Sequence, residues 1–177
     1  MESEKIVLAG GCFWCIEPVF KKINGVQTVI CGYTGGSTRN PTYEEICTGE
    51  TGHAEAIKIE FDRKIINLPT LLEVFFTIHD PTTLNRQGAD IGTQYRSAIF
   101  YEDEEQRAAA ENAISKTNKS RIWKNPVVTT VEPLTDFYEA EQYHQDFFTK
   151  NPNNRYCQLS ITPKLRKFYE LFKNLQQ

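Results

Sequence analysis

The 177-residue sequence has no long hydrophobic run, no excess of basic residues and only one methionine. A membrane-spanning helix needs about 18 or more consecutive apolar residues, so we expect no membrane segment. The formal net charge of -3 argues against nucleic acid as a partner, because phosphate binding requires a basic surface. Few methionines suit a protein that works among oxidants, although compositional drift explains the scarcity equally well.

Cysteine is also scarce and scattered along the chain. Its number is too small for the disulfide framework of a secreted domain, and the positions are Cys12, Cys15, Cys31, Cys47 and Cys157. The first residues lack the basic start, apolar stretch and cleavage site of a signal peptide. We therefore expect a cytoplasmic protein whose cysteines are catalytic or simply buried. The length favours a single domain over residues 1–177, which we expect to be monomeric.

Strand-like and helix-like patterns alternate through the first hundred residues. The apolar spacing predicts strands over 5–9, 26–33, 54–62 and 95–101, with helices after Cys12 and over 69–79. The resulting β-α-β-β-α-β order is that of the split-βαβ, ferredoxin-like fold. We therefore predict an α+β two-layer sandwich with a ferredoxin-like core and additional C-terminal helices and loops.

The remaining segments contain two long loops and several C-terminal elements. The loops over 34–52 and 80–93 have no predicted regular structure, which is common for functional loops. The later pattern predicts an alanine-rich helix from Asp103, a strand over 127–131, a helix over 137–150, a loop over 151–158 and a helix over 163–175.

The most informative motif is the pair Cys12 and Cys15, which enclose Phe13 and Trp14. In a C-x-x-C pair one thiol can react and the other can form a disulfide with it. The two aromatic rings place apolar surface beside the reactive sulfur. A zinc site is the alternative, but zinc needs about four ligands and no second C-x-x-C or paired histidine is present.

Cys12 is the predicted nucleophile because of its place at a helix start. Proline is tolerated in the first turn of a helix, so Pro18 predicts a helix that begins near Trp14 or Cys15. Cys12 then precedes the helix and faces the positive end of its dipole. This position lowers a thiol pKa from about 8.5 and favours the reactive thiolate.

Glu55 is the second candidate catalytic residue. Side chains alternate along the strand over 54–62, and Glu55 shares the apolar face of Ile57 and Ile59. Burial raises a carboxyl pKa above about 4.3, so a neutral glutamic acid there can donate a proton. The alternative is that the strand end is solvated and Glu55 has no such role.

Other polar residues carry weaker signals. Tyr43, Asp90 and Tyr95 lie in or beside the two long loops, where tyrosine hydroxyls can bind a polar oxygen, although ordinary packing explains each one alone. Cys157 lies in the expected polar loop and could move toward Cys12. The histidines lack the spacing of a metal site, so we expect no metal and interpret them as structural: His53, His79 and His144.

Taken together, these residues resemble the A-type methionine sulfoxide reductases. The similarity covers about residues 5–158, and it appears as separate blocks in the family's order. The blocks are Gly11-Cys12-Phe13-Trp14, Gly32-Tyr33-Thr34-Gly35-Gly36, Asn40-Pro41-Thr42-Tyr43, Thr51-Gly52-His53-Ala54-Glu55, His79-Asp80-Pro81, Arg86-Gln87-Gly88-Ala89-Asp90, Gly92-Thr93-Gln94-Tyr95-Arg96-Ser97, Phe137-Tyr138 and Ala140-Glu141-Gln142-Tyr143-His144-Gln145.

The resemblance implies reduction of the S epimer of methionine sulfoxide, free or in proteins, as a repair of oxidative damage. By this resemblance Cys12 attacks the sulfoxide sulfur and Glu55 protonates its oxygen. Further residues hold the substrate: Tyr43, Asp90 and Tyr95 at the oxygen, and Phe13 and Trp14 at the methyl group. A second thiol then forms a disulfide with Cys12, and thioredoxin, or dithiothreitol in vitro, reduces it. No bound cofactor is implied.

Two departures from the family leave the resolving thiol open. Many members have glycine where this chain has Cys15, and many end in a glycine-rich tail with a further cysteine. Here the C-terminal segment has a helical pattern instead. Cys157 falls where many relatives have a resolving cysteine, whereas Cys15 is nearer in sequence. We favour Cys15 as the first partner of Cys12, with Cys157 passing the disulfide outward.

Two other classes of protein remain possible from the sequence. A general C-x-x-C dithiol-disulfide oxidoreductase would also place its cysteines at a helix start, but it would not need Glu55 or the tyrosine-bearing loops. A non-catalytic module that binds sulfoxides or peptides would not need Cys12.

Overall fold

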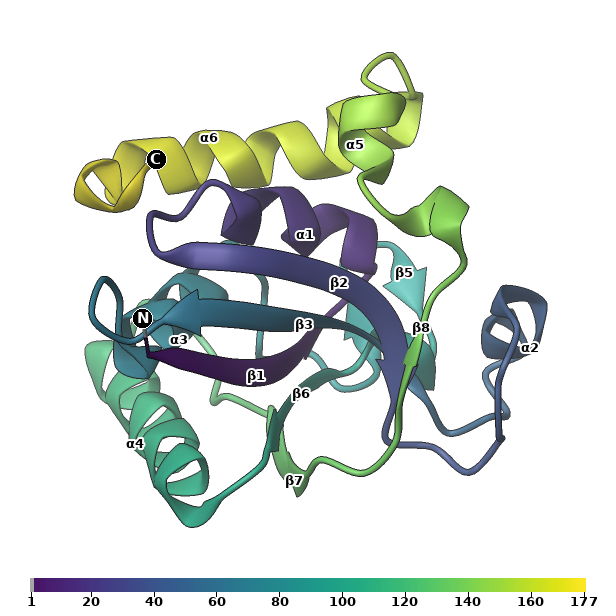
Figure 1. The fold of residues 1–177 in the computed structure, drawn as a ribbon, viewed down its shortest axis with the longest axis horizontal. Coiled ribbons are helices and arrows are strands. Elements are labelled where there is room, and N and C mark those ends of the chain that lie inside the picture. The colour runs from purple at the N-terminus through teal and green to yellow at the C-terminus, as the bar shows by residue number, and fades with distance from the viewer. Residues whose placement is uncertain (1) are drawn as a thin grey trace.

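The computed structural model describes residues 2–177, which form a curled six-stranded sheet covered by helices (Figure 1). The strands are ordered β7-β6-β1-β3-β2-β8, and the four central strands are antiparallel to one another. This arrangement confirms the predicted α+β fold with a ferredoxin-like core. The core elements are β1 (Ser3–Gly10), α1 (Phe13–Lys21), β2 (Val26–Thr34), β3 (Ala54–Asp62), α3 (Leu68–Ile78) and β6 (Ser97–Tyr101).

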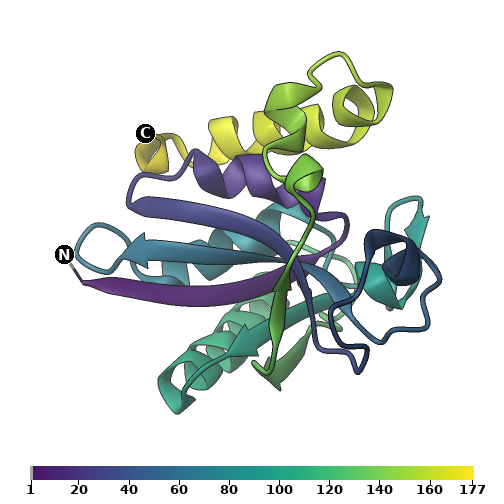
Figure 2. The same ribbon diagram turned by 45° about the vertical axis from the view of Figure 1, so that its right-hand side comes forward.

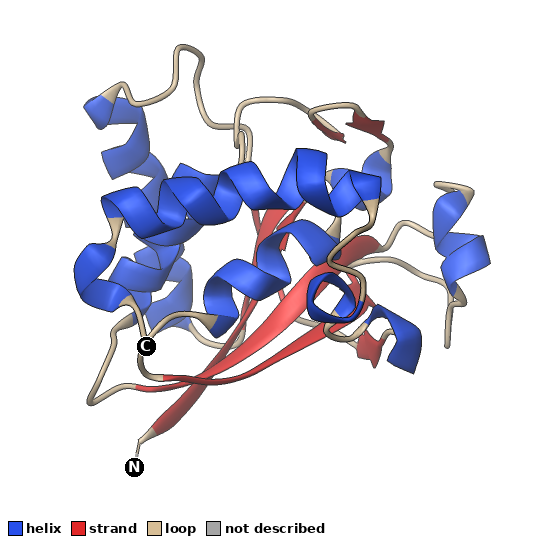
Figure 3. Cartoon of the chain, turned by 90° about the horizontal axis from the view of Figure 1, so that it is seen from above, coloured by secondary structure: helices blue, strands red, loops and turns tan. Residues whose placement is uncertain are grey.

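The hydrophobic core lies between one face of the sheet and the helices. Because side chains alternate along each strand, Leu8 and Ile57 point to this face, where they join Phe20 of α1 and Phe75 of α3 in one buried cluster. The opposite face carries a smaller cluster built mainly of alanines, covered in part by Leu134. Figure 3 shows the helices layered over the sheet. Glu55 therefore points into the larger cluster.

The predicted helix after Asp103 is confirmed as α4 (Glu104–Ser120). The side chain of Asp103 accepts a hydrogen bond from the N–H of Gln106 at 2.8 Å, which caps the first turn. The chain then enters β7 (Thr130–Pro133), which pairs in parallel with β6. The strand predicted over 127–131 therefore exists but lies a few residues further along.

Both predicted loops contain short regular elements. The loop over 34–52 includes α2 (Tyr43–Cys47), which begins with a capping box between Thr42 and Glu45. The loop over 80–93 includes β4 (Arg86–Gln87) and β5 (Asp90–Ile91), a small two-stranded sheet. A 3₁₀ turn over Thr93–Tyr95 follows, so the next strand begins at Ser97 rather than at residue 95.

The helix predicted over 137–150 is wrong. This segment forms β8 (Phe137–Glu139), a 3₁₀ turn (Gln142–His144) and the short helix α5 (Phe147–Lys150). β8 pairs with β2, where Gly32 permits the approach: a Cβ there would lie 2.3 Å from the Phe137 ring. Asp146 has a positive φ of 56°, which a continuous helix cannot include. Pairing with a distant strand thus overrides the local helical pattern.

The C-terminal segment folds back over α1. The chain is already helical at Arg155, continues through a π-helical segment (Cys157–Ile161) into α6 (Thr162–Leu171), and ends with a 3₁₀ turn (Lys173–Leu175). The predicted loop over 151–158 is therefore shorter, and Cys157 is fully buried rather than in a polar loop. α6 lies across α1 (Figure 1). No described helix is long and apolar enough to cross a bilayer.

Candidate active site

The start of α1 holds the C-x-x-C pair at one end of the sheet. Cys12 is the residue that precedes the helix, as predicted, but α1 already begins at Phe13. Pro18 therefore lies inside the helix, beyond its first turn, and removes one internal hydrogen bond. Gly11 reaches this point with a φ of +91°, and a Cβ there would meet the Gln87 side chain at 2.6 Å.

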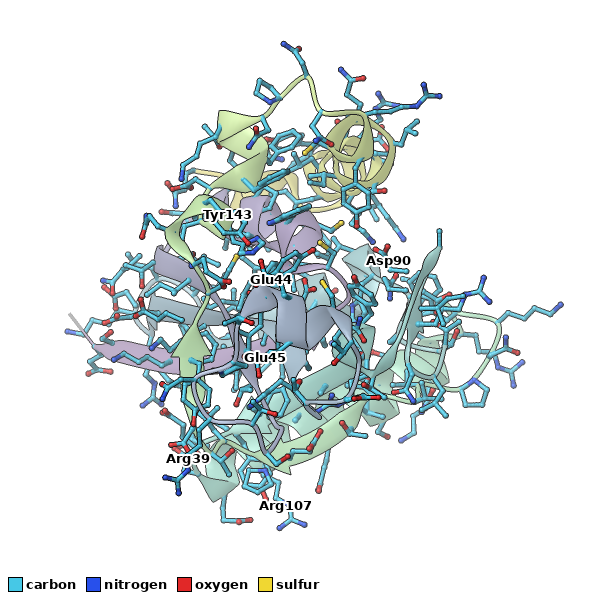
Figure 4. The ribbon with its side chains drawn as sticks, turned by 90° about the vertical axis from the view of Figure 1, so that its right-hand side faces the viewer. Arg39, Glu44, Glu45, Asp90, Arg107 and Tyr143 are labelled. Atoms are coloured by element: carbon cyan, nitrogen blue, oxygen red, sulfur yellow. The ribbon has the colours of Figure 1, made fainter. Side chains whose placement is uncertain are left out.

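Long-range packing brings the two loops to the same end of the molecule. Figure 2 shows α2 and the β4–β5 sheet beyond the ends of the central strands, where α1 begins. Figure 4 looks onto this end, with Asp90 on one side and Glu44 and Tyr143 on the other. The site is therefore assembled from segments that lie far apart in the sequence.

Glu55 lies beside Cys12, inside the protein. Its side chain is 1% exposed, which confirms the expected burial, and its Oε1 accepts a hydrogen bond from the N–H of Phe13 at 3.2 Å. Burial raises the pKa of Glu55 to about 8, and the carboxyl group interacts electrostatically with the Cys12 thiol. At neutral pH the group is therefore mostly a neutral acid that can donate a proton.

The two thiols contact each other but differ in their tendency to ionise. Burial, followed by the hydrogen bond to Cys15, raises the pKa of Cys12 well above its usual value. The predicted lowering of the Cys12 pKa is therefore wrong: the N–H of Trp14 does favour the thiolate, but desolvation outweighs it. The hydrogen bond from Cys12 lowers the pKa of Cys15, with further help from Tyr156 and Lys164.

Tyr156 connects Cys15 to Asp90. The Tyr156 hydroxyl lies 3.2 Å from the Cys15 sulfur and donates a hydrogen bond to Asp90 Oδ2 at 2.8 Å. Lys164 of α6 lies nearby, where its ammonium group donates to the carbonyl of Ile78 at 2.9 Å. Tyr156 and Lys164 were not singled out from the sequence. The only sequence signal for Tyr156 is its position directly before Cys157.

Tyr43 and Tyr95 face the acid from the two loops. Tyr43 opens α2 and Tyr95 ends the 3₁₀ turn before β6. Burial, followed by the negative charge of Glu55, raises the pKa of both hydroxyl groups. Both phenols therefore stay protonated and can donate hydrogen bonds. Asp90 also acts electrostatically on Glu55, so all of these predicted residues share one site.

An aromatic cluster forms the apolar side of the site. Phe13 is fully buried against Tyr33 and His144, with ring centroids 5.7 and 5.1 Å away. Trp14 is half-buried, stacks on Phe147 at 3.7 Å, and donates from Nε1 to His144 Nδ1 at 3.0 Å. His144 and Phe147 were not predicted as site residues. The sequence predicts only a structural role for His144. Burial lowers its pKa, which keeps the ring neutral.

The other two histidines form hydrogen bonds within the fold, and the remaining cysteines differ in how deeply they are buried. His53 bonds to the N–H of Gly36 and to the carbonyl of Thr38, and His79 bonds to Phe75 and Ser97. All five cysteines are free, with Cys31 buried and Cys47 exposed. Cys157 is buried, and the charge of Cys15 contributes to its raised pKa. Among residues 2–177, no group of three His, Cys, Asp or Glu residues is arranged to hold a metal ion.

Paired thiols beside a protonated carboxyl group, phenol donors and aromatic rings define a thiol-based oxidoreductase site. Comparison with known proteins identifies its family. Residues 4–176 match the family model of peptide methionine sulfoxide reductase. The chain is 56% identical to the peptide methionine sulfoxide reductase MsrA of Saccharolobus solfataricus, over 96% of this chain and 94% of that protein.

Solved structures agree with this assignment. Reduced Mxr1 from Saccharomyces cerevisiae superposes with a TM-score of 0.83 and 35% identity, over 88% of this chain and 90% of the other. Mxr1 in complex with Trx2 matches with a TM-score of 0.58 and 26% identity, over 82% and 85%. The chain therefore belongs to the peptide methionine sulfoxide reductase family. It is an MsrA-type oxidoreductase that uses thiols to reduce methionine sulfoxide, rather than a general dithiol-disulfide oxidoreductase.

Proposed function

We propose that the enzyme reduces the S epimer of methionine sulfoxide, free and in proteins, with Cys12 as nucleophile and Glu55 as acid. The observation that carries this proposal is a buried carboxyl group whose pKa is raised to about 8 and which the N–H of Phe13, the residue next to Cys12, holds at 3.2 Å. A sulfoxide oxygen becomes a better leaving group when it is protonated, and Glu55 has the proton to give. The enzyme would act as a monomer in the cytoplasm, where it would repair oxidised proteins.

Cys12 and Glu55 together supply and accept every proton that moves in the first step. The Cys12 sulfur attacks the sulfoxide sulfur, its thiol proton passes to one oxygen of Glu55, and the proton on the other oxygen moves to the sulfoxide. The S–O bond of the substrate then breaks and the hydroxyl group transfers to Cys12. Methionine is released with two electrons gained, and Cys12 becomes a sulfenic acid. Glu55 is protonated again at the end of the step.

The other predicted residues would bind the substrate around this centre. Tyr43 and Tyr95 would donate hydrogen bonds to the sulfoxide oxygen, since the two phenols remain protonated beside Glu55, and Asp90, itself an acceptor, would hold the oxygen through a bridging water. The rings of Phe13 and Trp14 would receive the methyl group, supported by the stacking of Trp14 on Phe147. Apolar surface beside hydrogen-bond donors matches the two sides of a methyl sulfoxide.

Cys15 is the first resolving thiol in this proposal, and Cys157 passes the disulfide outward. The position of the two cysteines supports the first exchange, because the N–H of Cys15 donates to the carbonyl of Cys12 at 3.0 Å and the two thiols interact electrostatically. Cys15 is also the thiol whose pKa is lowered, which favours nucleophilic attack. The electrostatic coupling of Cys157 to Cys15 supports the relay.

A thioredoxin would reduce the resulting disulfide, and the reaction would need no prosthetic group. The support is the solved complex of the structural relative Mxr1 with Trx2. Dithiothreitol would replace the thioredoxin in vitro.

Turnover of the separate epimers tests the nucleophile and the substrate. Wild type and Cys12→Ser would each be mixed with one epimer of methionine sulfoxide and dithiothreitol, and the methionine released would be measured. We expect wild type to reduce the S epimer, and the variant to release no methionine while it still binds the sulfoxide. Activity on the R epimer alone, or full activity of Cys12→Ser, contradicts the proposal.

Peptide mapping after one turnover without reductant tests the resolving thiol. We expect a Cys12–Cys15 disulfide in Cys157→Ser, and in wild type the same disulfide first and then its exchange product with Cys157. Cys47→Ser is the control for loss of an exposed thiol. A Cys12–Cys157 disulfide that forms at the normal rate in Cys15→Ser would remove Cys15 from the mechanism.

A further inference from the structure

The hydrogen bonds of Tyr156 form a continuous path from a buried sulfur to the edge of the site. The path starts at Cys15, which is 4% exposed, and ends at Asp90, which is only partly buried. The two links are 3.2 Å and 2.8 Å long. Tyr156 and Asp90 lie 66 positions apart in the sequence, so only the fold creates this path.

The path has a direction. A phenol carries a single proton, and the Tyr156 hydroxyl donates it to the carboxylate of Asp90. The hydroxyl oxygen therefore accepts a hydrogen bond from the thiol of Cys15 when that thiol is protonated. Burial, followed by the charges of Cys12 and Cys15, raises the pKa of Tyr156, so the phenol does not persist as an anion. The phenol can accept a proton from Cys15 only while it releases its own proton to Asp90.

We infer that Tyr156 is a catalytic residue of disulfide formation, and that it carries the proton of the attacking Cys15 thiol to Asp90. The inference rests on the proposed role of Cys15 as the resolving thiol. It assigns Tyr156 to the second chemical step and not to reduction of the sulfoxide. Asp90 then serves twice, first at the substrate oxygen and later as the proton acceptor for Cys15.

The step balances with the groups already present. The Cys15 sulfur attacks the sulfur of the Cys12 sulfenic acid, an S–S bond forms, and the S–O bond of Cys12 breaks. The proton of Cys15 moves to Tyr156 while the proton of Tyr156 moves to Asp90. The departing hydroxide takes the proton of Glu55 and leaves as water. Cys15 is oxidised and Cys12 is reduced. Asp90 then returns its proton to solvent and Glu55 takes one up from solvent, so both carboxyl groups are ready for the next turnover.

Lys164 supports the same step without taking part in the proton path. Its ammonium group is held in place by the carbonyl of Ile78, and its charge lowers the pKa of Cys15. A fixed positive charge stabilises the sulfur while the proton is in transit. The proton itself still passes through the Tyr156 hydroxyl, which is hydrogen-bonded to both Cys15 and Asp90.

Tyr156→Phe tests the inference because it removes only the hydroxyl group and keeps the ring beside Trp14. Wild type, Tyr156→Phe and Asp90→Asn would be compared in a Cys157→Ser background, so that Cys157 cannot compete with Cys15 for Cys12. Each protein would react once with saturating methionine sulfoxide and no reductant. Quenched samples would give the rate of methionine release and, by mass spectrometry, the rate of Cys12–Cys15 disulfide formation. Tyr169→Phe, on the exposed side of α6, is the matched control.

We expect Tyr156→Phe to release methionine at the wild-type rate and to form the disulfide at least about tenfold more slowly, since proton transfer by a placed side chain contributes about 10²-fold or more. The Tyr156→Phe, Asp90→Asn double variant should form the disulfide no more slowly than the slower single variant, because both act on one path. Tyr169→Phe should behave as wild type in both steps.

The failure of this inference is distinguishable from failure of the proposed function. A wild-type rate of disulfide formation in folded Tyr156→Phe overturns the proton path while Cys15 keeps its role. If thermal unfolding shows that Tyr156→Phe has lost its fold, a wild-type rate in Asp90→Asn overturns the path instead. A disulfide between Cys12 and Cys157 at the normal rate in Cys15→Ser overturns the proposed role of Cys15 as resolving thiol, and failure of wild type to release methionine from the S epimer overturns the proposed function itself.

Discussion

The two walls of the active site differ in how they are built. One, here called the core wall, consists of Cys12 directly before α1, Phe13 at the start of α1 and Glu55 on β3, all of them almost fully buried. The other, the covering wall, consists of residues 141–164 and includes Tyr156. Central strands of the sheet anchor the core wall, whereas turns and short helices carry the covering wall.

Burial of Cys157 and Ile161 in the hydrophobic cluster attaches the covering wall to the core, and polar contacts add to this attachment. Glu17 of α1 accepts a hydrogen bond from the N–H of Asp146 at 3.1 Å, and Tyr33 donates to Glu141 at 2.9 Å. The side chain of Gln145 bonds to both the N–H and the carbonyl of Cys31, at 2.9 Å each, and so continues the strand pairing of β8.

This difference indicates a division of labour. The rigid core wall holds the groups that break the S–O bond, where small displacements are costly. The covering wall supplies Trp14's stacking partner, the Tyr156 hydroxyl and Cys157, which serve substrate binding and the later thiol steps. Changes in the core wall should therefore stop the first step, and changes in the covering wall should affect stability or later steps.

The strongest test of this division is Glu55→Gln. The amide keeps the size and can still accept from the N–H of Phe13, but it cannot supply the proton. We expect the single-turnover rate of methionine release to fall by about 10²- to 10⁴-fold. Glu60→Gln, on the same strand but hydrogen-bonded to Ser3 at the other end, is the control and should retain its rate. Full turnover by Glu55→Gln would place the proton donor outside the core wall.

The same division separates what the sequence can predict from what it cannot. The strands and helices of the ferredoxin-like core follow from apolar spacing, and β3 occupies the predicted residues. The burial of Glu55 follows from the same alternation. These features depend on local pattern, which the sequence displays directly.

The covering wall depends on contacts that no local pattern contains. Residues 137–150 have helical spacing, yet pairing of residues 137–139 with residues 32–34 of β2 makes a strand of their first part. The prediction of a lowered pKa for Cys12 is wrong for a similar reason. The position at a helix start is a local feature, but the burial that outweighs its effect on the pKa comes from several elements. The link from Tyr156 to Asp90 is likewise a product of the fold.

A second test measures how the burial of Glu55 makes the free energy of unfolding depend on pH. The folded-state pKa is raised to about 8 from an ordinary 4.5, so the folded protein binds this proton more tightly than the unfolded chain does. The resulting stability is fully present below pH 4.5 and is lost as the pH rises toward 8. Each pKa unit corresponds to about 1.36 kcal/mol, so we expect a loss of about 2 to 5 kcal/mol.

Denaturant unfolding of wild type and Glu55→Gln between pH 4.5 and 9 measures this loss. The difference between the two proteins removes the contribution of every other titrating group. Wild type should lose stability relative to Glu55→Gln as the pH rises. Parallel curves across the whole range would mean that Glu55 is solvated and has an ordinary pKa.

The smallest expected effect concerns the attachment of the covering wall at Glu17. Glu17→Ala removes the acceptor for the N–H of Asp146 and the ion pair with Lys21 at 3.4 Å. Loss of a buried acceptor costs about 1–3 kcal/mol, so denaturant unfolding should show a decrease of that size. Glu17→Gln keeps an acceptor oxygen and should lose less, and the exposed Glu170→Ala is the control. The rate of methionine release at saturating substrate should stay near wild type in all three. A large fall of that rate in Glu17→Ala would show that the first step also needs the covering wall.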